Sequence, residues 1–238
     1  MATEGSRAAS EAEVGAQAGA ESHWVRWHLE YENPASPLTL RLRVVQAMVR
    51  DALDTAAPGP IRIVSLCAGQ GRDVIDVVAG HRRAADVQAL LVELDPALVA
   101  FARRRTDAAG LAEQVQVVEG DAAQCHWYED HVPADLVLVC GVFGNISDGD
   151  IARTVAALPG FCRTGADVIW TRHRRPPDAT PAIRAAFAAA GFDEVAFEAP
   201  DGYVLSVGRE RLRAGAPPVT FDPTDRLFEF VGDGFGAA

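Results

Sequence analysis

Lysine is absent from this chain of 238 residues, in which arginine supplies all 22 basic side chains. Enzymes that form a Schiff base with their substrate require a lysine amine, and the phosphate-binding loop of P-loop NTPases also requires a lysine. Both classes are therefore excluded. The lack of lysine, together with abundant alanine, indicates a GC-rich coding bias.

Cysteine and long apolar runs are also scarce. The four cysteines, Cys67, Cys125, Cys140 and Cys162, form no Cys-x-x-Cys pair, so no zinc ribbon or dithiol redox site is indicated and no metal site is predicted. No apolar run is long enough to cross a bilayer, and the first 20 residues lack the basic and apolar pattern of a secretory signal. We therefore expect a cytoplasmic protein with free, mostly buried thiols.

Positive charge is scarce, because 33 acidic side chains outnumber the 22 arginines and give the chain a net charge of −11. Affinity for nucleic acid comes mainly from clustered positive charge, and the densest basic stretch is the short run Arg172-His173-Arg174-Arg175. We expect a small-molecule partner and neither a nucleic acid nor a membrane.

The chain divides into four predicted segments. Residues 1–21, rich in Ala, Glu, Gly and Ser, are predicted to be a disordered tail. Residues 22–58 are predicted to be a helical cap, in which a cluster of aromatic residues precedes an amphipathic helix at 38–53. Residues 59–213 form the main domain, and residues 214–238 are expected to be a strap whose Leu227, Phe228 and Phe230 dock on it.

Strands and helices alternate through the main domain. This alternation predicts a three-layer, doubly wound α/β fold with a mostly parallel, seven-stranded sheet. Two final strands, at 194–198 and 203–209, flank Pro200-Asp201-Gly202 and are predicted to form an antiparallel hairpin. The earlier strands are predicted at 61–66, 87–94, 115–119, 134–140 and 166–171, and the helices at 72–78, 96–105, 151–158 and 181–190.

A glycine loop follows the first predicted strand, in Ser65-Leu66-Cys67-Ala68-Gly69-Gln70-Gly71. Glycines between a strand and a helix let a ligand approach the backbone closely, and the helix N-terminus favours an anion such as a phosphate or a carboxylate. Open α/β sheets bind ligands beyond the carboxyl ends of their strands, so this loop is a candidate ligand site.

Carboxylates end the next two strands. Glu93, followed by Leu94, closes the second strand, where its side chain could accept hydrogen bonds from both hydroxyls of a ribose. Asp121 follows the third strand and could accept from an adenine amine, while the N–H of Ala122 meets a ring nitrogen. Gly141, just after the fourth strand, would border the reactive end of such a ligand.

With these residues in place, the run from Ile61 to Thr171 resembles the core of class I S-adenosylmethionine-dependent methyltransferases, and the hairpin extends the resemblance to about Arg209. The family loop usually begins with an acidic residue and has a further glycine, where this chain has Ser65 and Cys67. Asp73 and Tyr31 are therefore candidates to hold the amino group of the cofactor. The resemblance implies S-adenosylmethionine as cofactor, with contacts at Ala68, Gly69, Gln70, Gly71, Glu93, Leu94, Asp121, Ala122 and Gly141.

Methyl transfer to an oxygen, nitrogen or carbon of a small molecule, by in-line displacement, is the expected reaction. Three alternatives stay open. A dinucleotide site would need a third glycine at the position of Val74. A cofactor-binding module without catalysis is suggested by the altered loop, and an aminopropyl transferase would need acidic groups such as Asp148 and Asp150 for a polyamine.

Residues that carry chemistry are harder to assign, because a sulfonium is already activated and a base is needed only when the acceptor loses a proton. His173 is the first candidate for a base or a substrate contact, and Arg172 could bind an acidic group of the substrate. Both could instead be solvated charges of a loop. The cap aromatics could form a lid over the acceptor or simply anchor the first helix; they are Trp24, Trp27, His28 and Tyr31.

Overall fold

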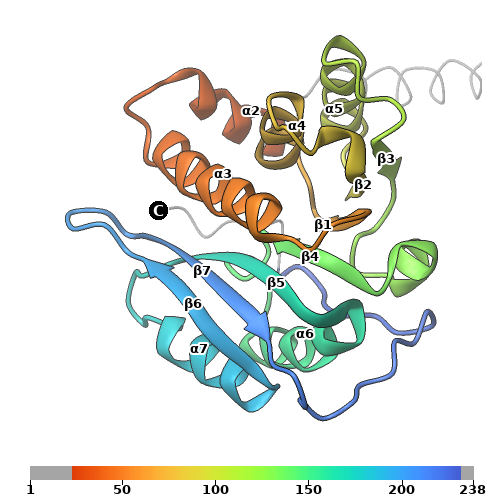
Figure 1. Cartoon of the computed structure of the whole chain (residues 1–238). Coiled ribbons are helices and arrows are strands. Elements are labelled where there is room, and N and C mark those ends of the chain that lie inside the picture. The colour runs from red at the N-terminus through yellow and green to blue at the C-terminus, as the bar shows by residue number, and fades with distance from the viewer. Residues whose placement is uncertain (1–22, 232–238) are drawn as a thin grey trace, which may run out of the picture.

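A seven-stranded sheet separates two layers of helices (Figure 1) in the computed structural model, which describes residues 23–231. The predicted tail, residues 1–21, and the last seven residues of the predicted strap lie outside the described residues. The strand order is β3-β2-β1-β4-β5-β7-β6. The strands are β1 (Ile61–Leu66), β2 (Val87–Glu93), β3 (Val115–Glu119), β4 (Ala134–Val139), β5 (Cys162–His173), β6 (Phe192–Glu198) and β7 (Leu205–Leu212).

The pairing confirms the predicted fold class. Strands β1 to β5 run parallel, and β7 is antiparallel to both β5 and β6. Strand β5 ends at His173, so Arg172 and His173 belong to the strand, whereas the sequence had suggested that they lie in a loop after it. The register pairs Arg172 with Ser206 and His173 with Leu205, which fixes the end of β5 against β7.

Three helices pack on one face of the sheet and two on the other (Figure 1). Local signals explain several helix starts: Ser36 and Asp95 accept hydrogen bonds from the first turns of α3 and α5, each followed by a proline. On the first face lie α3 (Pro37–Thr55), α4 (Arg72–Ala79) and α5 (Pro96–Ala108), and on the other α6 (Asp148–Phe161) and α7 (Thr180–Ala189). The shorter elements are α2 (His23–His28), η1 (Leu29–Glu32), η2 (Ala84–Asp86) and η3 (Cys125–His131).

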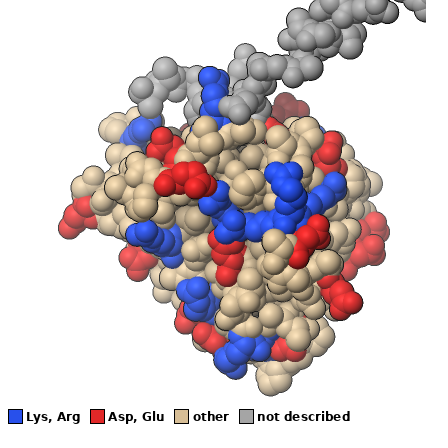
Figure 2. Space-filling model, turned by 90° about the horizontal axis from the view of Figure 1, so that it is seen from above, with Lys and Arg blue, Asp and Glu red and all other residues tan. Residues whose placement is uncertain are grey.

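Charged side chains of both signs are mixed on the surface. On the face seen from above (Figure 2), arginines lie beside aspartates and glutamates over much of the visible surface. Within residues 23–231, no helix is both long and apolar enough to span a membrane, and no three His, Cys, Asp or Glu side chains come together as metal ligands would.

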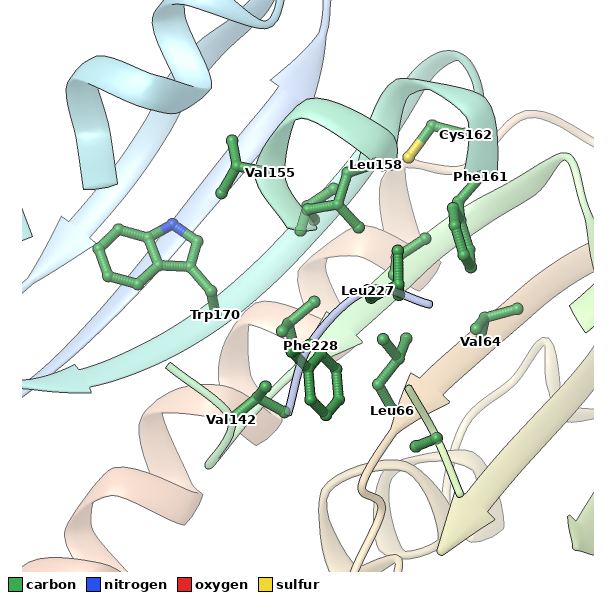
Figure 3. Close-up of a cluster of buried hydrophobic side chains, with 14 of the residues drawn as sticks. Val64, Leu66, Val142, Val155, Leu158, Phe161, Cys162, Trp170, Leu227 and Phe228 are labelled. Carbon is green, nitrogen blue, oxygen red and sulfur yellow. The ribbon is translucent and has the colours of Figure 1, made fainter. Parts of the chain in front are cut away.

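Alternating strand residues face two separate hydrophobic clusters, as expected for a sheet covered on both faces. Ile61 and Ile63 of β1 face α3 and α4, whereas Val64 and Leu66 face α6. The predicted docking of the strap is confirmed for two residues, because Leu227 and Phe228 are each only 1% exposed. Figure 3 shows them among side chains from the sheet and α6.

Candidate active site

A cavity of about 970 Å³ opens at the carboxyl ends of the central strands, where the strand order reverses between β1 and β4. This is the position at which open α/β sheets bind ligands, and the volume is at the upper end of the roughly 300–1,000 Å³ of small-ligand sites. All but one of the predicted site residues line it: Tyr31, Ala68, Gly69, Gln70, Glu93, Leu94, Asp121, Ala122, Gly141 and His173.

Gly71 is the exception, because it is buried and does not line the cavity. Its φ is +66°, and an added Cβ would lie 2.6 Å from Ile75 Cδ1 and 2.8 Å from Leu91 Cδ2. Close packing of α4 on β2 therefore accounts for a glycine at this position.

The glycine loop is fastened to the end of β2. Gly69 N–H donates to Glu93 Oε2 at 2.7 Å, and Ala68 N–H donates to the carbonyl of Val92 at 3.0 Å. Cys67 has a φ of +51°, and it is the one residue other than glycine with positive φ among residues 23–231. The loop thus keeps the left-handed turn that a glycine would favour, at the position where the family loop usually has one.

Glu93 is the fixed carboxylate of the site. Its Oε1 accepts from the N–H groups of Leu94 and Asp95, both at 2.9 Å, in addition to the bond from Gly69 to Oε2. The residue is 8% exposed, and burial raises the pKa of the carboxyl above its usual range, although the three N–H donors oppose that shift. Each oxygen retains further acceptor capacity, so the carboxylate can take hydroxyl donors from the cavity.

Asp121 is held by two partners. Its Oδ1 accepts from Ala123 N–H at 3.0 Å, and its Oδ2 pairs with Arg226 of the strap at 2.7 Å. Arg226 lies far from this loop in the chain and was not identified from the sequence. The strap therefore helps to fix the position of an acid at the cavity wall.

The cap forms a second wall, which favours its interpretation as a lid. Trp24, Trp27 and Tyr31 line the cavity, and the ring of Tyr31 packs 6.1 Å from that of Trp27. Arg41 Nη2 donates to the Tyr31 hydroxyl at 3.1 Å. His28 is 7% exposed, and burial lowers its pKa to about 4, so its imidazole is neutral at pH 7.

Two parts of the cap close on the glycine loop and on the strap. His28 rests so near Gly69 that an added Cβ there would lie 2.5 Å from its Nε2. Trp24 contacts Phe230 of the strap edge to face, with ring centroids 6.1 Å apart. The lid therefore contacts both the glycine loop and the strap.

Asp73 supplies a second acid, at the start of α4. It lines the cavity, and its Oδ1 accepts from Val74 N–H at 3.0 Å. Burial raises its pKa to about 6, while the positive charge of Arg41 acts in the opposite direction. An ammonium group of a ligand would favour the ionised form of this side chain.

The opposite end of the cavity is basic. Arg172, His173 and Arg175 line it, beside the turn that follows β4. Burial and the charges of Arg172 and Arg175 lower the pKa of His173, which leaves the imidazole neutral at pH 7 and able to accept a proton. Gly141 N–H donates to Thr171 Oγ1 at 2.8 Å, which joins the two strand ends.

The predicted acidic pair does not face the cavity together. Asp148 lines it, but Asp150 is 7% exposed, pairs with Arg153 and accepts from Glu229 N–H. Asp148 and Asp150 therefore do not form the pair of carboxylates that a polyamine would need.

Comparison with known proteins gives a family match. Residues 37–184, more than half of the chain, match the model of a family described as "Putative methyltransferase". S-adenosylmethionine is the cofactor of that family. A search of curated proteins found no match by sequence.

Solved structures share the fold at low sequence identity. A magnesium protoporphyrin IX methyltransferase from Synechocystis, with bound S-adenosylmethionine, has a TM-score of 0.64 and 13% identity over 81% of this chain and 92% of its own. An O-methyltransferase family protein from Burkholderia thailandensis has a TM-score of 0.56 and 16% identity over 73% of this chain. This chain spans only 57% of that protein. The cyclase SpnF, with a TM-score of 0.54 and 12% identity over 71% of this chain and 82% of its own, shares the fold as well, so the fold alone does not define a reaction.

Proposed function

Because the chain belongs to this methyltransferase family, we propose that it transfers the methyl group of S-adenosylmethionine to a small-molecule acceptor by in-line displacement. The observation that carries the proposal is the convergence of the glycine loop, Glu93 and Asp121 on one cavity that extends well beyond them. One part of the cavity suits an adenosine and the rest is left for an acceptor.

In this proposal the ribose hydroxyls donate to Glu93, and the adenine lies between Leu94 and the loop of Asp121 and Ala122. The backbone at Ala68, Gly69 and Gln70 faces the methionine portion, whose carboxylate suits the N-terminus of α4. Asp73 and Tyr31, on the same wall, are the candidates for its amino group. The methyl group then points toward Gly141 and the basic end of the cavity.

S-adenosylmethionine supplies an activated methyl group when it is bound. In the transfer, the acceptor would donate an electron pair to that methyl carbon, and the sulfur would keep both electrons of the broken bond. An acceptor hydroxyl or amine loses a proton in the process, and we assign that proton to the neutral imidazole of His173. The aromatic side chains of the lid would exclude water from the reacting atoms.

A small-molecule acceptor is favoured over a nucleic acid by charge. The chain carries a net charge of −11, and on the face seen in Figure 2 the basic side chains are interspersed with acidic ones. A binding module without turnover is the alternative, and it predicts cofactor binding with no methylated product from any acceptor.

Titration calorimetry with S-adenosylhomocysteine tests the cofactor site. We expect micromolar binding, equivalent to about −8 kcal/mol, to be lost in Glu93→Ala. The matched control is Glu119→Ala, because Glu119 ends the neighbouring strand in register with Glu93 but is exposed. A folded wild-type protein that does not bind the nucleoside would refute the proposal, and so would equal loss of affinity in both variants.

A further inference from the structure

Arginines without a carboxylate partner gather on this cavity. Within the part of the chain that the structure describes, Arg41, Arg172 and Arg175 form no ion pair, although acids outnumber bases in the chain by 33 to 22. Arg72, which also lines the cavity, pairs with Glu32 instead. Cations left unpaired in a concave site are available to a ligand anion.

Two of these arginines, Arg172 and Arg175, lie away from the proposed position of the cofactor, whereas Arg41 lies beside it. Arg41 packs over Trp27, 5.1 Å from its ring centroid, on the wall of the methionine portion. Arg172 and Arg175 belong to the end of β5 and the loop after it, and Arg172 lies beside the turn that follows β4. Arg41 is placed to bind the methionine carboxylate. Arg172 and Arg175 therefore have no ligand in the proposed cofactor arrangement.

Arg172 is held in place by one hydrogen bond, but another of its N–H groups has no partner among the described residues. Its Nη1 donates to the carbonyl of Phe143, while its buried Nε has no hydrogen-bond partner among the described residues. A Cβ on Gly144 would lie 3.8 Å from Arg172 Nη1 and 3.9 Å from His173 Cδ2, so both side chains face the turn after β4. Asp148 lines the same region and Asp178 acts on Arg172 through its charge, yet neither forms an ion pair with it.

The backbone around these side chains is fixed. Ser206 Oγ donates to the Arg172 carbonyl at 2.7 Å, and Arg174 N–H donates to the Val204 carbonyl at 2.6 Å. A guanidinium presented by a rigid strand end loses little further freedom when it binds a planar anion. Three aromatic side chains, Trp24, Trp27 and Phe230, also line the cavity.

We propose that the methyl acceptor is an aromatic carboxylic acid, whose carboxylate binds Arg172 and Arg175 and whose ring packs on the aromatic wall of the lid. This inference rests on the proposed function. The carboxylate is the anchor and is unchanged by the reaction, while a hydroxyl or amine on the same ring takes the methyl group and gives its proton to His173.

The test compares acids with their neutral counterparts on protein saturated with S-adenosylhomocysteine. Benzoate, salicylate, 4-hydroxybenzoate and 4-hydroxyphenylacetate are each titrated beside the corresponding amide, with calorimetry as the readout. We expect at least one acid to bind at least tenfold more tightly than its amide. Arg172→Gln and Arg175→Gln should remove that preference and leave the affinity for S-adenosylhomocysteine unchanged.

Arg104→Gln is the matched control, because Arg104 is exposed on α5, forms no ion pair among the described residues and does not line the cavity. It should retain the preference for the acid. Equal binding of acids and amides, no binding of any acid, or an unchanged preference in Arg172→Gln would overturn the inference. Because S-adenosylhomocysteine is titrated separately, each of these results can be distinguished from failure of the cofactor site itself.

Discussion

Asp73 is an acid whose charge should change within the ordinary assay range. Its pKa is raised to about 6 by burial, so in the free protein it is ionised at pH 7 and mostly neutral at pH 5. If it holds the ammonium group of the cofactor, affinity for S-adenosylhomocysteine should fall about tenfold between pH 7 and pH 5, since binding of a cation needs the ionised form.

Calorimetry at pH 5, 6, 7 and 8 measures this dependence. Asp73→Asn should bind more weakly at pH 7 and show a flat profile across the range. Asp76→Asn is the control, because Asp76 lies on the same helix but pairs with Arg105 and does not line the cavity. A slope that is as steep in Asp73→Asn as in the wild type would assign the titration to another group.

Gly69 offers a steric test of the lid. In Gly69→Ala the new Cβ would lie 2.5 Å from His28 Nε2, so either the lid or the loop must move, and we expect affinity for S-adenosylhomocysteine to fall at least tenfold. Gly165→Ala separates this clash from backbone strain, because Gly165 has a φ of +81° with no atom within 4 Å of the added Cβ. Both variants should lose about 1 kcal/mol of unfolding free energy.

Urea denaturation and calorimetry on both variants measure the two effects. Only Gly69→Ala should lose affinity. If Gly165→Ala binds just as poorly, the clash with His28 is not the cause.

At the residue scale, site residues could be predicted from the sequence where the residues next to them in the chain show what surrounds them. The glycine loop and Glu93 each lie at a strand end, and a strand end can be read from hydrophobic patterning. Arg226 could not be identified in this way, because it reaches Asp121 across 105 positions and the segment around it has no periodic pattern. The close packing at Gly71, beside Ile75 and Leu91, could not be predicted either, because it depends on helix and strand distances that the sequence does not contain.

Among the elements, α3 is tied to the sheet through an ionic cluster that has two buried side chains, Asp167 and Arg209. Asp167 of β5 is 4% exposed and accepts hydrogen bonds from Arg209 and Arg211 of β7, at 2.6 Å and 2.8 Å for the shorter contact of each arginine. Arg209, 3% exposed, also pairs with Asp51 of α3. Removal of Asp167 would leave the buried Arg209 with only Asp51, an exposed carboxylate, as its partner, and Arg211 would lose its ion pair.

Asp167→Asn should therefore lose about 3 kcal/mol of unfolding free energy, as measured by urea denaturation at pH 7. The matched comparison is Arg184→Ala, which breaks the more exposed pair of Arg184 with Glu194 and should cost less than about 1 kcal/mol. Equal losses in the two variants would show that burial does not govern the contribution of these pairs.

Charged and exposed residues explain why two strands, β7 and β5, were predicted too short. The sequence placed the last strand at 203–209, but β7 continues to Leu212, with Arg209 and Glu210 both buried. Charged side chains break an apolar pattern, and their burial is compensated by partners that sequence does not reveal, such as Trp170 Nε1, which donates to Glu210 at 3.2 Å. Strand β5 was likewise predicted from Ala166, because Arg163 and the two residues after it are exposed.

For the whole molecule, the strap connects the core to the site. Leu227 and Phe228 are buried between the sheet and α6, while Phe230, only two residues on, lines the cavity and meets Trp24 of the lid. The docking of these apolar residues was predictable from their hydrophobicity. Their place beside the lid was not, since the lid and the strap lie near opposite ends of the chain and share no local pattern.

Phe228 and Phe230 therefore form a matched pair for separating stability from binding. Phe228→Ala should lose about 3–5 kcal/mol of unfolding free energy, because it empties a fully packed position in the core. Phe230→Ala should lose less than about 1 kcal/mol, since its side chain is 39% exposed, but it should weaken binding of S-adenosylhomocysteine or of an aromatic acceptor by removing part of the cavity wall.

Urea denaturation without ligand, followed by calorimetry at a temperature at which both variants are folded, gives the two quantities for each variant. If the strap serves both roles, the larger loss of stability belongs to Phe228→Ala and the larger relative loss of affinity to Phe230→Ala. Identical urea midpoints in the two variants would contradict the packing of Phe228 in the core, whereas full affinity for every ligand in Phe230→Ala would remove the strap from the binding site and leave the lid alone to close it.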